Sequence, residues 1–420
     1  MIINNLNITS KKVQYSSSLR GQSLKQSVDN QYIRIASLSL AMTSRILLFI
    51  LISFSFVLTS KAQKHDFGGQ VIGWSTFNFN KPVLSQGGIR YIPDYKYKKK
   101  YKNHLVLKSN ISINAYGTGL LTGLDSINTD YDIKPYRLQV GLSGEQFDLR
   151  IGLQKINFGS ASMLRPLMWF DKIDPRDPLQ LTDGVYGLLG RYYFLNNANI
   201  WLWSLFGNEK TKGWEIFQSN WKIPEIGGRI QYPLLTGELA ATYHHRKGIF
   251  SDSFADTLSS RDGFSENRFA LDGKFDYEIG FWFETVLIHQ NLDFTNQCYQ
   301  RIINIGADYT FGLGNGLSVK TEFFAYQQTN KVFNKGRGIN FSAISITYPL
   351  NIINNIQAIV YYDVTNNDIY RFVNFSWTYD DWMFYVMGFW NPDNFQIYQN
   401  VRETRMFGGY GAQIMLVFNY

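Results

Sequence analysis

The stretch from Pro135 to Gln154 reads PYRLQVGLSGEQFDLRIGLQ and contains two runs in which apolar and polar residues alternate. A period of two is that of β-strands, whose successive side chains point to opposite faces. The runs meet at Gly144-Glu145, a two-residue connection with glycine first, which is typical of a type II′ hairpin turn. The sequence therefore predicts a β-hairpin in which Ser143 faces Gln146.

The two faces of this hairpin differ in chemistry. The apolar face carries Tyr136, Leu138, Val140, Leu142, Phe147, Leu149, Ile151 and Leu153. The other face carries Gln139, Asp148 and two arginines, Arg137 and Arg150. A soluble β-sandwich produces this pattern when one face packs on a core and the other meets water. A membrane β-barrel produces it with lipid outside and water inside, so the rest of the chain has to distinguish them.

The composition favours strands. Of 420 residues, 16% are aromatic and 35 are glycine, whereas only 10 are proline, which suits regular strands and tight turns. A mean hydropathy of −0.20 is too polar for a protein with many membrane helices. It is compatible with a barrel, because half of the strand residues of a barrel face water. The single cysteine, Cys298, excludes an intramolecular disulfide.

The N-terminus has the parts of a targeting segment. Arg45 precedes an apolar run at 46–58, and Ser60-Lys61-Ala62 is a small-x-small cleavage pattern. We interpret residues 42–62 as a secretory signal peptide, with a short membrane anchor as the alternative. Residues 1–41 are polar and without periodicity, and we interpret them as a non-native or disordered extension. The barrel is then expected within residues 63–420.

This interpretation changes the meaning of the charge. The formal net charge is +8, but residues 1–62 hold seven basic residues and one acidic residue. The remainder has 34 basic and 32 acidic residues, so the basic balance does not indicate nucleic-acid binding.

The hairpin pattern recurs along the chain, for example at 303–311 and 317–325. Short turns alternate with longer polar connections, such as 117–133 and 208–225, as they do in outer-membrane barrels. The sequence predicts an all-β transmembrane antiparallel up-and-down barrel of about 18 strands, if 213–220 belongs to a connection. Sixteen strands stay open as the alternative.

The last strand supports a membrane location. Tyr410, Ala412, Ile414, Leu416, Phe418 and Tyr420 form an apolar face that ends on the terminal aromatic residue. This resembles the insertion signal of bacterial outer-membrane barrels and implies the barrel-insertion machinery as a partner. We therefore expect a Gram-negative outer membrane, with Leu138, Leu149, Ile303 and Leu416 facing lipid. The aromatic residues Tyr192, Trp201, Trp203 and Trp390 are expected in girdles at the membrane interfaces.

One long connection, residues 155–184, breaks the strand pattern. It places Met168-Trp169-Phe170 among charged residues, which a solvated loop does not require. We expect it to fold into the barrel and narrow the pore, with packing on the outer rim as the alternative. The candidate constriction residues are Arg165, Trp169, Asp171, Asp174, Arg176 and Asp177.

The same region carries a family resemblance. The run GLQKINFG at 152–159, followed by RPL and by DPRDP at 174–178, resembles the strand-plus-loop signature of large porin-like barrels. The alginate-export and substrate-specific porin groups have comparable segments. The resemblance implies a channel, but Asp174 replaces a frequent asparagine, and the substrate of no such family is carried over.

The inward face is expected to be slightly basic. The hairpin phase points Arg137, Arg150, Arg191, Arg229, Arg268, Lys274 and Lys320 inward, against Asp148, Glu238, Asp272, Asp308 and Glu322. The pore-lining candidates are Arg137, Arg150, Arg191, Arg229, Lys320 and Glu322. Either these charges pair with one another, or they give a mild anion preference. We expect passive diffusion of small polar or anionic solutes through a channel in outer-membrane lipid.

No catalytic motif is present. The five histidines lack zinc-ligand spacing, and there is no G-x-S-x-G elbow or phosphate loop. No catalytic residue, metal or cofactor is assigned, and the protein is not expected to be an enzyme or to bind nucleic acid. An export or assembly barrel with a plugged lumen is the alternative, and an outer-membrane hydrolase is a further one. The sequence leaves the oligomeric state open.

Overall fold

The structure is a computed structural model that describes residues 63–420 except 103, 123–125, 251–262, 293–294 and 394–405. The expected extension at 1–41 and the expected signal peptide at 42–62 lie outside the described residues. Lys64–Tyr420 forms one compact unit. No helix among the described residues is long and apolar enough to span a bilayer.

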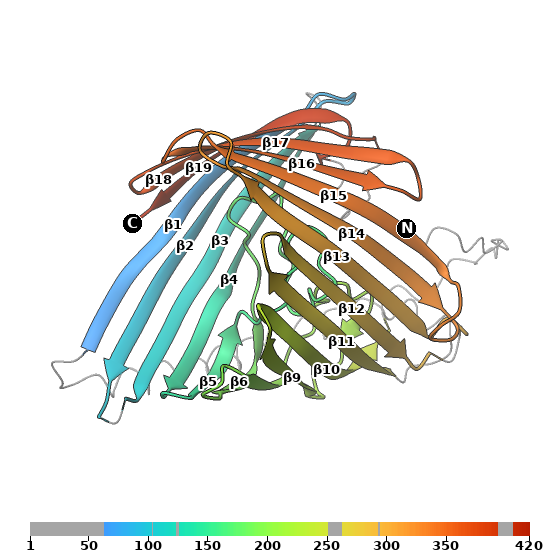
Figure 1. The fold of residues 1–420 in the computed structure, drawn as a ribbon. Helices are drawn as coiled ribbons and strands as arrows, with labels where there is room; N and C mark the ends of the chain where they lie inside the picture. The colour runs from blue at the N-terminus through green and yellow to red at the C-terminus, as the bar shows by residue number, and fades with distance from the viewer. Residues whose placement is uncertain (1–62, 103, 123–125, 251–262, 293–294, 394–405) are drawn as a thin grey trace, which may run out of the picture. The chain divides into compact units, whose positions relative to one another are not determined.

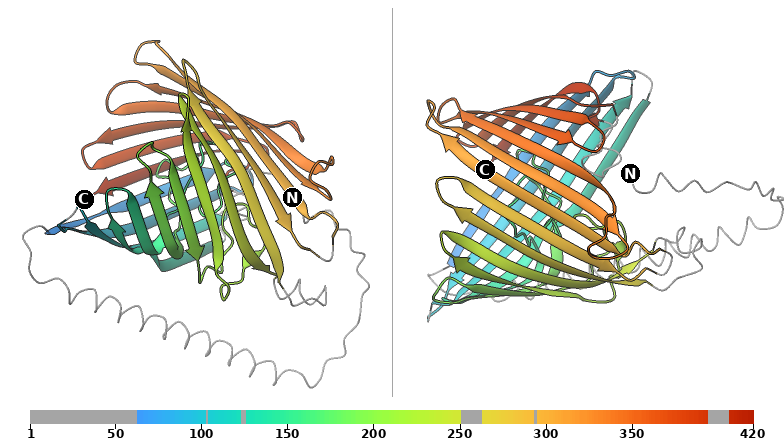
Figure 2. Two further views of the ribbon diagram at one scale, coloured as in Figure 1. Left: turned by 60° about the horizontal axis from the view of Figure 1, so that its bottom comes forward. Right: turned by 45° about the vertical axis from the view of Figure 1, so that its right-hand side comes forward.

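The described chain forms one closed antiparallel β-barrel whose wall contains 18 strands (Figures 1 and 2). Each strand pairs with its neighbours in sequence, and the ring closes where β1 pairs with both β2 and β19. The strands are β1 (Gln63–Asn78), β2 (Leu84–Lys100), β3 (Val106–Thr122), β4 (Ser126–Ser143), β5 (Phe147–Gln154), β6 (Val185–Tyr193), β7 (Asn199–Leu205), β9 (Glu225–Leu234), β10 (Gly237–Ile249), β11 (Phe264–Asp276), β12 (Gly280–Gln290), β13 (Tyr299–Phe311), β14 (Leu317–Thr329), β15 (Arg337–Pro349), β16 (Asn354–Asp363), β17 (Asp368–Tyr379), β18 (Trp382–Trp390) and β19 (Tyr410–Asn419). The predicted all-β fold and the count of 18 are confirmed.

The uncertain segment 213–220 belongs to a connection. It contains only the two-residue strand β8 (Gln218–Ser219), which pairs with the end of β10 at Gly248 and Ile249. The wall passes directly from β7 to β9, in register from Leu205↔Glu225 to Asn199↔Gln231.

The hairpin at 135–154 forms, but its predicted register is wrong by two residues. Ser143 pairs with Asp148 rather than Gln146, and Gly144 N–H donates to the Phe147 carbonyl at 2.9 Å. The turn is therefore centred on Glu145-Gln146. In agreement with this, Gly144 does not have the positive φ that a type II′ turn would require of it. A shift of two residues keeps every side chain between these ends on its predicted face.

Tyr136 and Leu153 are the exceptions, since both face the barrel interior rather than lipid. A β-bulge leaves Tyr136 as an extra residue, because Ser112 pairs with Arg137 while Ile113 pairs with Pro135. Gly152 has a φ of +113°, which breaks the alternation before Leu153. These irregularities re-aim both side chains inward.

The long connection predicted at 117–133 is also wrong. β3 continues to Thr122 and β4 begins at Ser126, in register along that whole length. Glycine and aspartate at 117, 119, 130 and 132 indicated a loop, but in this ladder they occupy paired strand positions. Tertiary pairing has overridden their low strand propensity.

The outer wall is apolar where the alternation predicts it. Leu149, Ile303 and Leu416 are each about two-fifths exposed on this face. Tyr192 and Trp390 also point outward. Trp201 and Trp203 do not belong to an outer girdle, since both pack on the core cluster inside the barrel. The prediction that the aromatic residues of β7 form an outer girdle is therefore wrong.

Candidate functional site

Residues 155–184, which we call the first inward segment, lie inside the ring of strands (Figure 1). Glu284 of β12 holds one part of it. Its carboxylate accepts hydrogen bonds from Ala161 N–H at 2.8 Å and from Leu167 N–H at 3.3 Å. These two bonds pin the segment to a strand far from it in sequence.

Glu322 of β14 holds the adjoining turn. Its carboxylate accepts bonds from Ser162 N–H and Leu164 N–H, each at 2.7 Å, and from Met163 N–H at 3.1 Å. Asn304 of β13 donates to the Leu164 carbonyl at 2.8 Å. The first inward segment therefore crosses from β5 to the wall formed by β12, β13 and β14.

Apolar side chains of the first inward segment fill this part of the lumen. Phe158 stacks on Trp203 at 5.8 Å, and Phe170 meets the same ring edge-on at 5.5 Å. The cluster on the segment consists of Ile156, Phe158, Met163, Leu164, Leu167, Trp169 and Phe170. It packs against inward residues of strands from β6 to β18, including Ile302 and Phe324. Burial of this apolar surface stabilises the inward position.

The constriction candidates mostly fix the shape of the segment itself. Arg165 and Asp171 form a buried pair at 3.2 Å. Burial raises the pKa of the Asp171 carboxyl, against the opposing effect of Arg165. Arg176 binds Asp174 and lies over the Phe372 and Phe407 rings, at 5.3 and 4.8 Å.

Asp177 caps the last turn of the segment by accepting bonds from Leu179 N–H at 2.9 Å and Leu181 N–H at 3.1 Å. Burial raises the pKa of this carboxyl too. Asp171, Asp174, Arg176 and Asp177 line open space, whereas Arg165 and Trp169 do not.

A second connection also turns into the barrel, and the sequence analysis missed it. Residues 207–220 form this second inward segment between β7 and β9. Trp214 stacks on Phe324 at 5.5 Å and donates to the Arg165 carbonyl at 2.7 Å, so the two inward segments contact each other. The signal available in the sequence was Trp214 with Phe217 inside an otherwise polar loop.

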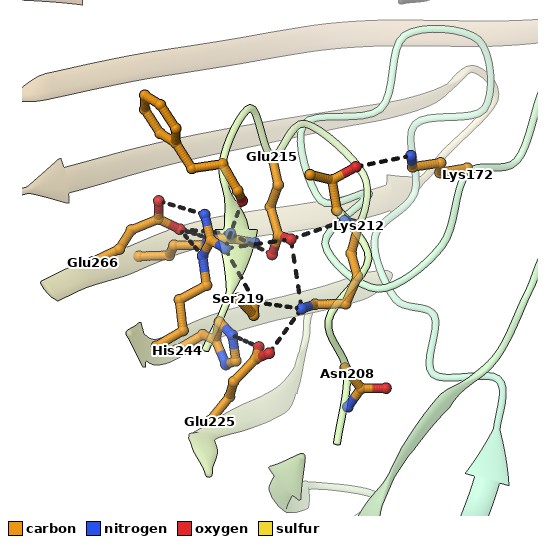
Figure 3. A network of polar contacts seen from close by, with 12 residues as sticks. Lys172, Asn208, Lys212, Glu215, Ser219, Glu225, His244 and Glu266 are labelled. Atoms are coloured by element: carbon orange, nitrogen blue, oxygen red, sulfur yellow. Dashed lines mark hydrogen bonds and ion pairs between the residues drawn. The ribbon is translucent and has the colours of Figure 1, made fainter. Parts of the chain in front are cut away.

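A buried ion cluster fixes the second inward segment to the wall of β9, β10 and β11 (Figure 3). It consists of Lys212, Glu215, Glu225, His244, Arg246, Glu266 and Arg268. Lys212 Nζ lies 2.7 Å from Glu225, and Arg268 lies 2.7 Å from Glu215. Arg246 binds Glu266 through two nitrogens, at 2.7 and 2.9 Å. Charges buried to this degree persist only when each is paired.

His244 is part of this cluster rather than of a hydrolytic site. Its Nδ1 accepts from the Trp203 indole at 3.2 Å, and its Nε2 faces Glu225 at 3.1 Å. Ser219 Oγ instead contacts Lys212 at 2.9 Å and Arg246 at 3.1 Å. Both imidazole nitrogens are therefore committed to groups other than a hydroxyl nucleophile.

One large cavity of about 2280 Å³ lies between the inward segments and the wall of β1 to β4. It extends from the end of the barrel at which β1 and β3 terminate, which we call the loop side, down to Ile72, Leu153 and Met415. Its wall carries Trp74, Thr76, Arg90, Asn114, Tyr116 and Thr118.

An apolar cluster, which we call the apolar constriction, lies at the floor of this cavity. Ile72, Ile92, Met415 and Val417 of the wall pack there against Leu179 and Leu181 of the first inward segment. On the opposite side of it, toward the short turns, the inner faces of β2 to β5 form what we call the open wall. Buried oxygens without a hydrogen-bond partner among the described residues belong there to Asp94, Asn110 and Ser112. Buried polar atoms are nearly always hydrogen-bonded, so these groups indicate water.

The pore-lining candidates divide into two groups. Arg137 donates to the Thr182 carbonyl at 3.0 Å, Arg150 pairs with Asp148 at 2.7 Å, and Arg191 lies 3.7 Å from the Trp201 ring. These three arginines lie on β4, β5 and β6. Among the described residues, Asp148 is the only carboxylate that forms an ion pair with one of them.

The other three candidates lie against other residues of the protein. Arg229 is buried and binds Asp272 through two nitrogens, at 2.6 and 2.7 Å. Lys320 lies 6.0 Å from the Trp282 ring, and Glu322 holds the first inward segment. Glu284, whose role equals that of Glu322, was not among the predicted residues.

Comparison with solved structures places the fold. The chain superposes on OccAB1 of Acinetobacter baumannii with a TM-score of 0.51 at 10% identity, over 86% of this chain and 97% of that one. OccK5 of Pseudomonas aeruginosa gives 0.49 at 9% identity over 85% and 97%. An anion-selective porin of Comamonas acidovorans gives 0.47 at 12% identity over 85% and 100%.

No protein-family model and no curated protein sequence matches the chain. At 10% identity, the likeness to OccAB1 is one of fold: the chain has the fold of porin-like outer-membrane barrels.

Proposed function

We propose that this protein is an outer-membrane channel for passive diffusion of small polar solutes, with a mild preference for anions. The observation that carries the proposal is the pairing of a large polar cavity on the loop side with the open wall on the turn side. The two meet at the apolar constriction. Hydrophobic constrictions of this kind gate channels by excluding water, and small displacements of their side chains open them.

The anion preference rests on the turn-side mouth. Three arginines lie there, Arg137, Arg150 and Arg191. Among the described residues, the only carboxylate that forms an ion pair with any of them is that of Asp148, which binds Arg150. In confined water, such fixed charge favours counter-ions. The cavity itself is lined by seven basic and seven acidic residues, so it contributes little net selection.

The outer surface supports the location. The apolar outward residues and the C-terminal apolar strand suit lipid and the barrel-insertion machinery. The same features support an outer membrane rather than a soluble location, with export directed by the expected signal peptide.

The test is ion conductance of the refolded protein in planar bilayers. We expect defined single-channel steps in the intact protein. Replacing residues 163–178 by a short flexible linker should raise the conductance several-fold, because this piece fills the lumen between β5 and β14. Unchanged conductance would show that the segment does not limit the current. Heat-modifiable migration on gels is the control for folding.

A plugged export or assembly barrel is the second candidate, and the two inward segments favour it. Such a barrel would fold and insert but conduct only after residues 163–178 are removed. Absence of current in both proteins would overturn the channel proposal. A hydrolase would require a nucleophile beside a base, and His244 contacts Trp203 and Glu225 instead.

A further inference from the structure

We propose that the cavity contains a sugar-binding subsite formed by Trp74, Arg90 and Tyr116. This inference deepens the proposed channel function by naming a solute class, and therefore rests on it. The three side chains come from β1, β2 and β3, which are neighbours in the wall, and all three line the cavity.

The subsite is a continuous stack. The Arg90 guanidinium lies 5.4 Å from the centre of the Trp74 ring and 5.4 Å from that of Tyr116. The absence of a side chain at Gly88 leaves room for the indole, because a Cβ there would lie 2.3 Å from the Trp74 ring. The wall is therefore shaped so that Trp74 lies against the backbone and the stack faces the cavity.

Arg90, which is half-buried, differs from the buried arginines of the barrel. Arg176, Arg229 and Arg246 each bind a carboxylate. Among the described residues, Arg90 has neither a hydrogen bond nor an ion pair, and its Nε is buried without a partner. Asn114, on the same inner face, is 5% exposed and also has an unpartnered oxygen, Oδ1. Donors and an acceptor are thus aimed into the cavity with nothing bound to them.

A sugar fits this chemistry better than a simple anion. Aromatic faces bind the apolar C–H face of a pyranose ring, while a guanidinium and an amide donate to and accept from its hydroxyls. The neighbouring cavity residues Thr76, Gln86 and Thr118 are neutral donors and acceptors as well. Lys134, another cation of the cavity, is already paired with Asp183 at 2.7 Å.

The experiment is titration of maltotriose against the ion current of the channel. We expect saturable block of the intact protein. Arg90→Gln and Trp74→Ala should each raise the half-blocking concentration about tenfold, which corresponds to the loss of one stacking or charged contact. Arg371→Gln and Trp390→Ala are matched controls, because this pair lies 5.9 Å apart on the outer face and should leave the block unchanged.

A further variant distinguishes weakened sugar binding from a failure to fold. Arg90→Lys keeps the charge but loses the planar group that stacks between two rings, so we expect it to fold and still weaken the block. Block equal to that of the intact protein in Arg90→Lys and in Trp74→Ala would overturn the subsite. Block by glucuronate without block by maltotriose would also overturn it, in favour of an anion site.

Calorimetric titration of maltotriose into the detergent-solubilised barrel distinguishes this inference from the channel proposal. Heat of binding that Arg90→Gln abolishes, in a protein that carries no current, would support the subsite and reject the channel. Current without either block or heat would support the channel and reject the subsite.

Discussion

The open wall of β2 to β5 and the wall of β9 to β14 are built from the same alternation of apolar and polar residues, yet their interiors are opposite. On the open wall, Asp94, Asn110 and Ser112 have oxygens without a hydrogen-bond partner in the described part of the chain. On the other wall, Arg229, Arg246 and Glu322 are buried, and each is bound to protein. The period of two selects an inner face in both cases, but it does not select what covers that face.

The difference comes from the connections. The two inward segments enter after β5 and after β7, and they cover the inner face of the strands that follow. Their backbone amides and charged side chains replace water as partners of Glu284, Glu322 and Glu225. The wall of β2 to β5 meets the first inward segment at Ile92, Lys134 and Arg137, whereas oxygens of Asp94, Asn110 and Ser112 lack a partner among the described residues and are left to water. One half of the barrel is therefore a packed core, and the other half is a wet surface.

The largest expected contrast between the two walls is in stability. Arg246→Met should lower the free energy of unfolding by about 3–5 kcal/mol, because it leaves buried carboxylates with fewer partners. Arg150→Met on the open wall should lower it by about 0–1 kcal/mol, since that ion pair is partly solvated. Urea unfolding in lipid vesicles measures both. Equal losses would mean that the two walls are equally hydrated.

The next largest effect on stability compares a residue on the outer face of the barrel with its neighbour on the inner face. Leu149→Arg should cost about 2–4 kcal/mol if the residue lies near the bilayer midplane. Arg150→Leu, the adjacent residue, should fold with little loss. The same unfolding assay compares them, and normal folding of Leu149→Arg beside failure of Arg150→Leu would reverse inside and outside.

The strands were predictable because their signal is local. Alternation at 138–151 gives the correct faces even though the turn is centred on Glu145-Gln146, since the register error was an even number of residues. Where the backbone is irregular, as at Tyr136 and Gly152, the alternation fails, because a bulge changes the phase without a mark in the hydrophobic pattern.

The interior was less predictable because its contacts join distant parts of the chain. The anomalous composition of residues 155–184 indicated an inward segment. Nothing near Glu284 or Glu322 in sequence indicates that their partners are the amides of residues 161–167. The second inward segment carried a weaker signal, Trp214 and Phe217, which a polar loop concealed.

A smaller effect tests the attachment of the first inward segment. Glu322→Gln should weaken three backbone hydrogen bonds and cost about 1.5–3 kcal/mol, the range for bonds to a charged group. The loosened segment should add fluctuations to the single-channel current. Glu238→Gln is the control, because that inward carboxylate bonds Gln231 rather than the segment. If the current noise of Glu322→Gln equalled that of the control, the first inward segment would not influence the current.

The smallest expected effect is on ion selectivity, and it tests whether the turn-side mouth acts as the filter. Arg191 lies over Trp201, and Arg150 is partly offset by Asp148, so neither presents an isolated charge to the lumen. Arg150→Ala and Arg191→Ala should therefore each shift the reversal potential in a salt gradient by only a few millivolts toward cations. The double variant should add the two shifts, because fixed charges on one wall act on the same water. Arg229→Lys is the control on the packed wall, where Asp272 still binds the charge and the reversal potential should not move. If the control moved the potential and the Arg150 and Arg191 variants did not, the ions would follow the packed wall instead.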